Sequence, residues 1–216
     1  MKRRLLTNLR NEVVTCWLYS GLRDFYISFE FEEANRWHAY STFFCSLGLE
    51  KSCKAYLIGT ESARYEKMGR VRALQEVNKI AQGYGHDLQN LLRCLQTRGV
   101  VSNPQIAKGI GGYTGGELIQ VLENAYREAR YPMPNPTYKK YPISTGRESY
   151  RGYQVPIGET APIKYARDVA SAITKRAFQD FSVSSPSRFS NKISDRKWRR
   201  FRRLLQFGMA RKKLES

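Results

Sequence analysis

Residues 32–59 read EEANRWHAYSTFFCSLGLEKSCKAYLIG, and this stretch decides the fold. Apolar and small side chains recur in it at steps of three and four residues, as Trp37, Ser41 and Phe44 illustrate. That spacing places them on one face of an α-helix, whereas the side chains of a strand alternate at every second residue. We therefore predict one long, mostly buried helix over residues 32–59.

Shorter stretches with the same periodicity follow along the chain. Their apolar positions are Met68, Val71, Leu74, Val77 and Ala81; Leu88, Leu91, Leu92 and Leu95; Leu118, Val121, Leu122, Ala125 and Ala129; and Ile163, Ala166, Ala170, Ile173 and Ala177. The first 30 residues alternate poorly, so residues 13–19 and 25–31 are each compatible with helix or strand. We predict an all-α fold, an up-down bundle of four to five helices with a basic C-terminal helix.

Segments without helical periodicity divide the chain. Residues 102–116 are a glycine-rich loop, and residues 131–159 hold five of the eight prolines. Residues 182–191 are rich in serine, which is typical of a linker. We expect an N-terminal extension over residues 1–31, a helical domain over residues 32–181, and a linker with a basic helix over residues 182–216.

The charge of the chain is strongly positive. Its 216 residues carry 37 Lys and Arg against 19 Asp and Glu, a formal net charge of +18. Residues 188–216 hold 11 basic and two acidic residues, so half of this excess lies in the last 29 positions. Such a charge opposes compaction unless an anion binds, which favours a polyanion partner. RNA or DNA is the favoured polyanion, and an anionic membrane surface is the second choice.

The expected C-terminal helix carries the densest charge. Trp198, Phe201 and Leu205 fall on one side of it. The flanking cations, which we expect to contact phosphates, are Arg196, Lys197, Arg199, Arg200, Arg202 and Arg203. Arginine and lysine without intervening acids favour a nucleic-acid backbone, although the aromatic side is also compatible with a membrane surface.

Tyrosines and cations alternate within residues 131–159. The tyrosines are Tyr131, Tyr138, Tyr141, Tyr150 and Tyr153, and the cations are Lys139, Lys140, Arg147 and Arg151. Aromatic rings stack unpaired bases while cations hold phosphates, so Lys139 and Lys140 are candidate nucleic-acid contacts. The alternative is a loop whose tyrosines pack on the helical domain.

The four cysteines give no sign of a metal site. Cys16, Cys45, Cys53 and Cys94 form no Cys-x-x-Cys pair and have no histidine cluster nearby. They are typical of reduced cysteines in a cytoplasmic protein, and we expect neither a metal nor a cofactor. Polar residues after the basic start of the chain predict no secretion signal, and no stretch is apolar enough to span a membrane.

Two polar features have both a structural and a functional interpretation. His86 is one of two histidines and lies in Gly85-His86-Asp87-Leu88, where Gly85 permits a bend and Asp87 caps the next helix. Glu50 and Lys54 are four residues apart on one helical face. His86 is either a turn residue or a polar contact in a groove. The pair is either a solvated ion pair or part of a polar site.

Three short motifs occur in order: Glu50-Lys51-x-x-Lys54-Ala55, Gly85-His86-Asp87-Leu88, and Ala129-Arg130-Tyr131-Pro132. In order and spacing they resemble HEPN domains, especially the HEPN partners of minimal nucleotidyltransferases. The resemblance covers residues 32–181. It implies an up-down helical bundle that dimerises and binds nucleotides or RNA, in toxin–antitoxin or phage-defence systems. A nucleotidyltransferase is the partner that it implies.

Many proteins of this family are metal-independent ribonucleases in which four to six residues separate an arginine from a following histidine. This chain departs from that signature, because Lys79, Ile80 and Ala81 occupy those positions before His86. Lysine lacks the planar fork that grips a phosphate through two bonds. We expect RNA or nucleotide binding without standard nuclease activity, and a polar groove lined by Glu50, Lys54, Lys79 and Asp87. The alternatives are a ribonuclease that uses His86 as acid/base with Arg130 or Lys79 as phosphate clamp, and a non-catalytic scaffold for a nucleotidyltransferase.

Overall fold

The computed structural model describes residues 2–33, 38–130, 161–181 and 183. Within these ranges the regular structure is helical, apart from one isolated bridge between Ile110 and Tyr113, so the all-α prediction is confirmed. The elements are α1 (Lys2–Glu33), α2 (His38–Thr60), the 3₁₀ turn η1 (Ser62–Arg64), α3 (Arg70–Gly83), α4 (Leu88–Thr97), α5 (Asn103–Ala107), α6 (Gly115–Arg130) and α7 (Ala161–Phe181).

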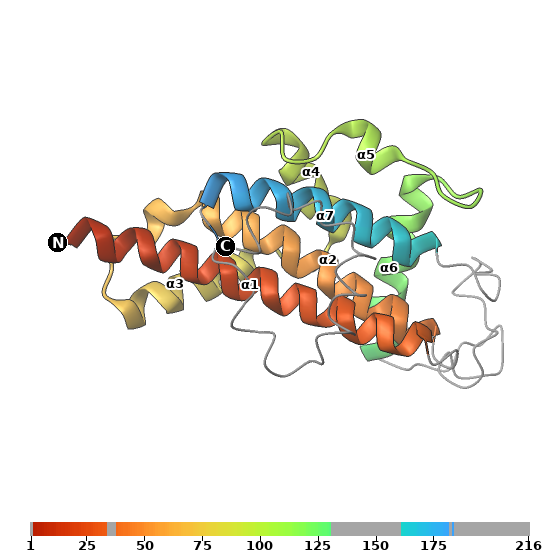
Figure 1. The fold of residues 1–216 in the computed structure, drawn as a ribbon, viewed down its shortest axis with the longest axis horizontal. Helices are drawn as coiled ribbons and strands as arrows, with labels where there is room; N and C mark the ends of the chain where they lie inside the picture. Colours follow the sequence, from red (N-terminus) through yellow and green to blue (C-terminus); the bar gives the residue numbers. More distant parts are fainter. Residues whose placement is uncertain (1, 34–37, 131–160, 182, 184–216) are drawn as a thin grey trace, which may run out of the picture.

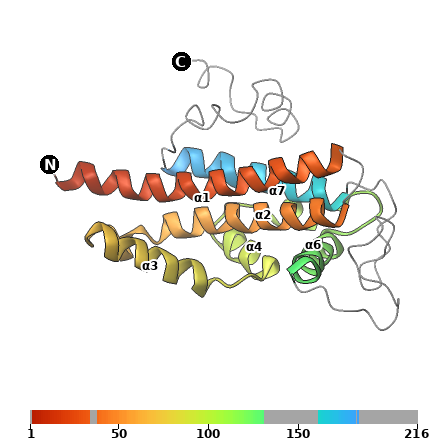
Figure 2. The same cartoon turned by 90° about the horizontal axis from the view of Figure 1, so that it is seen from below.

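The helix α2 lies at the centre of the described fold. It runs beside α1 in the opposite direction, and it also contacts α3, α4, α6 and α7 (Figure 1). In Figure 2, α1 and α7 lie on one side of α2, whereas α3, α4 and α6 lie on the other. The helix α2 therefore lies between helices from distant parts of the sequence.

The N-terminal residues form a core helix. Apolar side chains of α1 at steps of three and four are buried, namely Val14, Leu18, Leu22, Phe25 and Phe29. The segment expected as an N-terminal extension thus contributes to the main core. The long helix predicted over residues 32–59 begins later, at His38, and ends at Thr60, because Glu33 belongs to α1.

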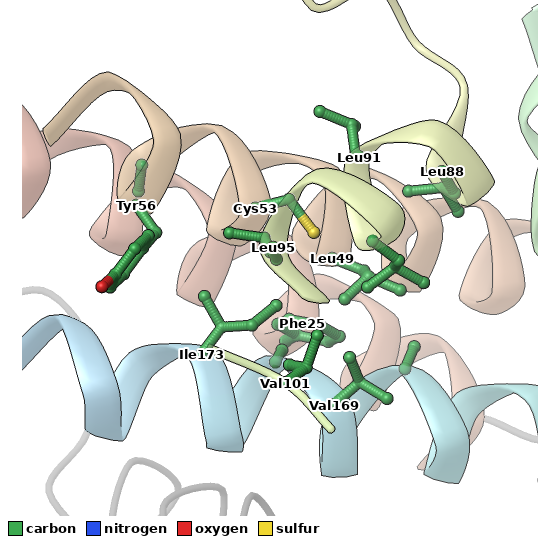
Figure 3. Close-up of a cluster of buried hydrophobic side chains, with 14 of the residues drawn as sticks. Phe25, Leu49, Cys53, Tyr56, Leu88, Leu91, Leu95, Val101, Val169 and Ile173 are labelled. Atoms are coloured by element: carbon green, nitrogen blue, oxygen red, sulfur yellow. The ribbon is translucent and has the colours of Figure 1, made fainter. Parts of the chain in front are cut away.

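The main core forms where α1, α2, α4 and α7 meet. Figure 3 shows Phe25 of α1, Leu49 of α2, Leu95 of α4 and Ile173 of α7 converging there. All four are fully buried. Each buried side chain of this size contributes about 1.5–3 kcal/mol through removal of apolar surface from water. Apolar packing therefore fixes how α4 sits on α2, and with it the turn that precedes α4.

The axes of α1 and α2 approach closely at two glycines. A Cβ on Gly48 would lie 2.8 Å from the Phe25 ring and 3.0 Å from the backbone oxygen of Gly21. A Cβ on Gly21 would lie 2.9 Å from the Gly48 oxygen. These contacts are shorter than carbon atoms tolerate, so the crossing requires residues without side chains.

A second, smaller core holds α3 against α1 and α2. Its buried residues include Leu9, Ile58, Tyr65, Val77 and Ile80. The helix predicted in this region is present, but part of its apolar stripe faces solvent, because Met68, Val71 and Leu74 are exposed. The buried face is instead formed by Ala73, Val77, Ile80 and Ala81.

The glycine-rich loop predicted over residues 102–116 contains a short helix, α5. The Ser102 hydroxyl accepts a hydrogen bond from the backbone of Gln105, whose side chain accepts one from the backbone of Ser102. This capping box starts the helix. Similar hydrogen bonds form at the start of α6. There the Glu117 carboxylate accepts hydrogen bonds from the backbone N–H and the hydroxyl of Thr114, at 2.7 and 2.9 Å.

Candidate functional site

The site begins with a buried ion pair on α2. Lys54 Nζ lies 2.9 Å from Glu50 Oε1, and the two side chains are only 4% and 7% exposed. The spacing of four residues places them on one helical face, as the sequence predicts. A buried charge requires a partner, since removal of an ion from water costs several kcal/mol. These two residues are therefore not an ordinary solvated pair.

His86 approaches the same carboxylate from the turn before α4. Gly85 adopts a left-handed φ of +64°, and Asp87 caps α4 by accepting a 2.8 Å hydrogen bond from the Asn90 backbone. Both roles agree with the sequence prediction. The turn directs His86 toward α2, where its Nδ1 lies 2.9 Å from Glu50 Oε1. His86 is thus both a turn residue and a polar contact, with 58% of its side chain exposed.

The Glu50 contact defines the tautomer of the imidazole. An ionised carboxylate only accepts hydrogen bonds, so in this contact the Nδ1–H group donates a hydrogen bond to Glu50 Oε1. In the neutral ring, Nε2 is then the unprotonated nitrogen. The Tyr126 hydroxyl of α6 lies 3.1 Å from Nδ1, and the Tyr126 ring stacks on His86 with centroids 5.4 Å apart.

A row of aromatic rings leads away from His86, and we call it the aromatic row. From the end of α1 to the turn before α4, it consists of Phe31, Phe44, Phe43, Tyr126 and His86. Neighbouring ring centroids are 5.7, 5.2, 6.1 and 5.4 Å apart in that order. The first four side chains are half-buried and His86 is exposed. The row is therefore partly accessible along its length.

Two acidic side chains accept hydrogen bonds from the backbone N–H groups at the N-terminus of α4, which follows His86 in the chain. Asp87 caps the helix, and Glu123 of α6 accepts a 3.2 Å hydrogen bond from the Gln89 backbone. Burial raises the pKa of the Glu123 carboxyl, the Gln89 N–H opposes this, and the charge of Asp87 adds to the rise. The free N–H groups that attract anions to a helix start are thus already bonded to protein carboxylates.

The predicted polar groove is brought together in part. Glu50, Lys54 and His86 meet directly, and Asp87 adjoins them as the cap of α4. Lys79 lies exposed on α3. None of the bonds described for Glu50 or His86 involves Lys79.

Other predicted contacts lie beyond what the structure describes. Arg130 ends α6, but its side chain is not described. Lys139 and Lys140 lie outside the described residues, as do Arg196, Lys197, Arg199, Arg200, Arg202 and Arg203. Their proposed contacts with RNA stay predictions.

Sequence reasoning missed Tyr126, Glu123 and Phe43. A signal for the first two was present, because a spacing of three residues places Glu123 and Tyr126 on neighbouring turns of one helical face. That Tyr126 contacts His86 and Glu123 contacts the start of α4 depends on how α6 packs against α2 and α4, which local spacing does not encode. Phe43 has no such signal, since it is one of several aromatic residues at the start of α2.

The described part of the chain holds neither a candidate metal site nor a candidate membrane span. No group of three histidine, cysteine or acidic side chains there could hold a metal ion. No helix in the same ranges is long and apolar enough to cross a membrane. Cys16, Cys45, Cys53 and Cys94 are all free thiols.

Comparison of the chain with models of protein families, with curated proteins and with solved structures found no match. The functional interpretation therefore depends on the site itself.

Proposed function

We propose that the chain is a cytoplasmic, HEPN-like RNA-binding protein whose site is the junction of α2, the Gly85 turn and α6. One observation carries this proposal. The motifs at residues 50–55 and 85–88, on which the resemblance depends, are joined by the 2.9 Å contact between Glu50 and His86. Two short motifs far apart in sequence thus contribute to one polar site. An up-down bundle and a role in toxin–antitoxin or phage-defence systems belong to the same proposal.

The charge distribution supports RNA as the polyanion. A net charge of +18 favours binding to a phosphate backbone, and residues 188–216 hold half of it. The phosphate contacts are assigned to Arg199, Arg200 and Arg203 first, and then to Lys139, Lys140, Arg196, Lys197 and Arg202. DNA and an anionic membrane surface remain outcomes of the test.

Salt dependence tests this proposal. The full chain is titrated against labelled single-stranded RNA, against DNA of the same sequence and against anionic vesicles, over a series of salt concentrations. We expect the RNA to bind most tightly, with log Kd rising linearly with log salt, because each phosphate contact releases counterions. Binding that does not depend on salt would contradict a polyanion partner. Preference for vesicles over RNA would favour the membrane alternative.

The Glu50–His86 contact also favours a second candidate, a metal-independent endoribonuclease. With Nδ1 bonded to Glu50, His86 Nε2 is available as a base, and the carboxylate stabilises the imidazolium that forms. Nε2 would take the proton of a ribose 2′-hydroxyl, whose oxygen attacks phosphorus while the 5′-oxygen leaves with a proton from solvent. Arg130 and Lys79 are the candidate phosphate contacts.

Incubation of RNA in EDTA separates the two candidates. If the chain only binds RNA, the RNA stays intact in the presence of wild-type protein. Cleavage that is lost in His86→Ala, which leaves the buried Glu50–Lys54 pair intact, would establish the second candidate. Gln75→Ala is a suitable control, because Gln75 is an exposed residue of α3. Capture of a nucleotidyltransferase without RNA would instead favour the scaffold role, and sedimentation would test the proposed homodimer.

A further inference from the structure

We propose that His86 is a stacking platform for an unpaired RNA base, so that the site binds single-stranded rather than duplex RNA. This inference rests on the proposed RNA binding and specifies which part of the RNA the site receives. It goes beyond phosphate contacts, which do not distinguish bases.

The orientation of the His86 ring is fixed before any ligand arrives. Its Nδ1 is bonded to Glu50 Oε1 at 2.9 Å, and that carboxylate is itself held by Lys54 inside the fold. The Tyr126 ring covers one side of the imidazole with an interplanar angle of 24°. A ring held in this way loses little conformational freedom on binding, which favours affinity.

The exposure of His86 leaves surface for a second planar ring. Although Glu50 and Tyr126 both contact it, the side chain is 58% exposed. A base that stacks on the imidazole would extend the aromatic row by one ring. Stacking on aromatic side chains is a recurrent way of binding unpaired bases, and it tolerates any base because each has a π-face.

The charges around His86 select a base over a phosphate. Glu50 contacts His86 directly, Asp87 follows it in the chain, and Glu123 caps the same helix. Asp87 and Glu123 are near enough for the charge of Asp87 to raise the pKa of Glu123. A phosphate would meet three carboxylates, whose charge is offset only in part by Lys54 at Glu50 and Arg127 near Glu123. A base carries no net charge and avoids this repulsion.

Duplex RNA does not satisfy this geometry. Its bases are already stacked on one another, and their faces are accessible only at ends, loops and bulges. A single strand of about ten nucleotides offers faces along its whole length. The preference for single strands should therefore come from His86, whereas the cations expected in residues 188–216 bind the backbone of either form.

The test compares two substitutions of His86 on two RNAs. Wild type, His86→Ala and His86→Phe are titrated with an oligoadenylate of about ten nucleotides and with a duplex of the same length. We expect His86→Ala to weaken single-strand binding about ten-fold and to leave duplex binding within about two-fold. His86→Phe keeps a planar ring without the nitrogens, so it should retain most of the single-strand affinity.

A 2-aminopurine base placed within the single strand reports stacking directly. Its fluorescence should fall on binding to wild type and His86→Phe, and should fall less with His86→Ala. Gln75→Ala serves as the control for a substitution on an exposed helix surface. Equal single-strand affinity of His86→Ala and wild type would overturn the inference while RNA binding stands. Failure of wild type to bind either RNA would overturn both proposals.

Discussion

At the scale of single residues, the Glu50 carboxylate organises the site. One oxygen, Oε1, lies 2.9 Å from both Lys54 Nζ and His86 Nδ1. The pairing with Lys54 could be read from the spacing of four residues. The pairing with His86 could not, because 36 positions separate the two and the contact exists only when α4 packs on α2.

Replacement of Lys54 tests the strength of the buried pair. Lys54→Met keeps the length of the side chain but leaves Glu50 buried without its cation. We expect a loss of about 3–5 kcal/mol in the free energy of unfolding, measured by urea denaturation. The double variant Glu50→Gln with Lys54→Met should recover part of this loss, since no unpaired charge remains.

The matched control for Lys54→Met is Lys164→Met. Lys164 pairs with Asp168 at 2.8 Å with the same spacing of four residues, but its side chain is 51% exposed. An exposed pair of this kind contributes less than about 1 kcal/mol. Equal losses in the two variants would show that burial does not strengthen the Glu50–Lys54 pair.

The hydrogen bond from Tyr84 to Glu61 should make the free energy of unfolding depend on pH in the acidic range. Burial acts to raise the pKa of the Glu61 carboxyl, but hydrogen bonds from Tyr84 and Arg64 outweigh it and leave the pKa below its ordinary value of 4.5. A lowered pKa stabilises the fold fully above pH 4.5, and this stabilisation is lost as the pH falls through the folded value. The advantage of wild type over Tyr84→Phe should therefore shrink in acid.

The Tyr84–Glu61 hydrogen bond also predicts that the protein loses stability at alkaline pH. Burial, reinforced by the hydrogen bond to Glu61, raises the pKa of Tyr84 from 10.0 to about 12. A raised pKa stabilises the fold fully below pH 10, and the contribution is lost as the pH rises toward 12. Urea denaturation of wild type and Tyr84→Phe across the pH range should show a plateau in their difference. A difference that is constant at every pH would assign the effect to packing alone.

At the scale of elements, helix existence was more predictable than helix packing. The third, fourth and fifth periodic stretches appear as α4, α6 and α7. In α3, the exposed residues Val71 and Leu74 look as apolar in sequence as the buried Val77 and Ile80, so only the contact with α1 and α2 decides which face is covered. The sequence did not distinguish helix from strand in residues 13–19 and 25–31. Apolar side chains such as Trp17 and Tyr26 also lie beside the buried stripe of α1, so the helical periodicity is hard to recognise.

Close packing of α1 on α2 predicts that Gly48→Ala is destabilising. The new methyl group would meet the Phe25 ring at 2.8 Å, and that ring is fully buried and cannot move aside freely. We expect a loss of about 1–3 kcal/mol, measured by thermal and urea denaturation. Gly116→Ala is the control, because nothing lies within 4 Å of its Cβ, and alanine there should instead stabilise α6 by about 0.5–1 kcal/mol. Loss of stability in both variants would mean that contact with Phe25 is not the cause.

At the scale of the whole molecule, composition predicts a class of partner, and the fold does not alter that expectation. Several cations on the described helices are paired with acids, as Arg70 is with Glu12 and Arg176 is with Asp180. The surplus is densest in residues 188–216, with 11 basic residues against two acidic ones. The strength of RNA binding and its discrimination between forms of RNA should therefore reside in different parts of the chain.

A triple substitution tests this division. Arg199→Gln, Arg200→Gln and Arg203→Gln together remove three proposed phosphate contacts, each of which contributes about 0.7 to the salt slope for a single strand. We expect the slope of log Kd against log salt to fall by about 2, with weaker binding of single strands and duplexes alike.

The control removes the same net charge from cations that are already paired. Arg70→Gln, Lys164→Gln and Arg176→Gln disrupt ion pairs with Glu12, Asp168 and Asp180. Because each of these cations is neutralised by a neighbour, their loss should change the slope much less. Equal effects in the two triple variants would mean that overall charge, and not the C-terminal arginines, determines affinity. A triple C-terminal variant that keeps its preference for single strands while losing affinity would separate backbone binding from base stacking at His86.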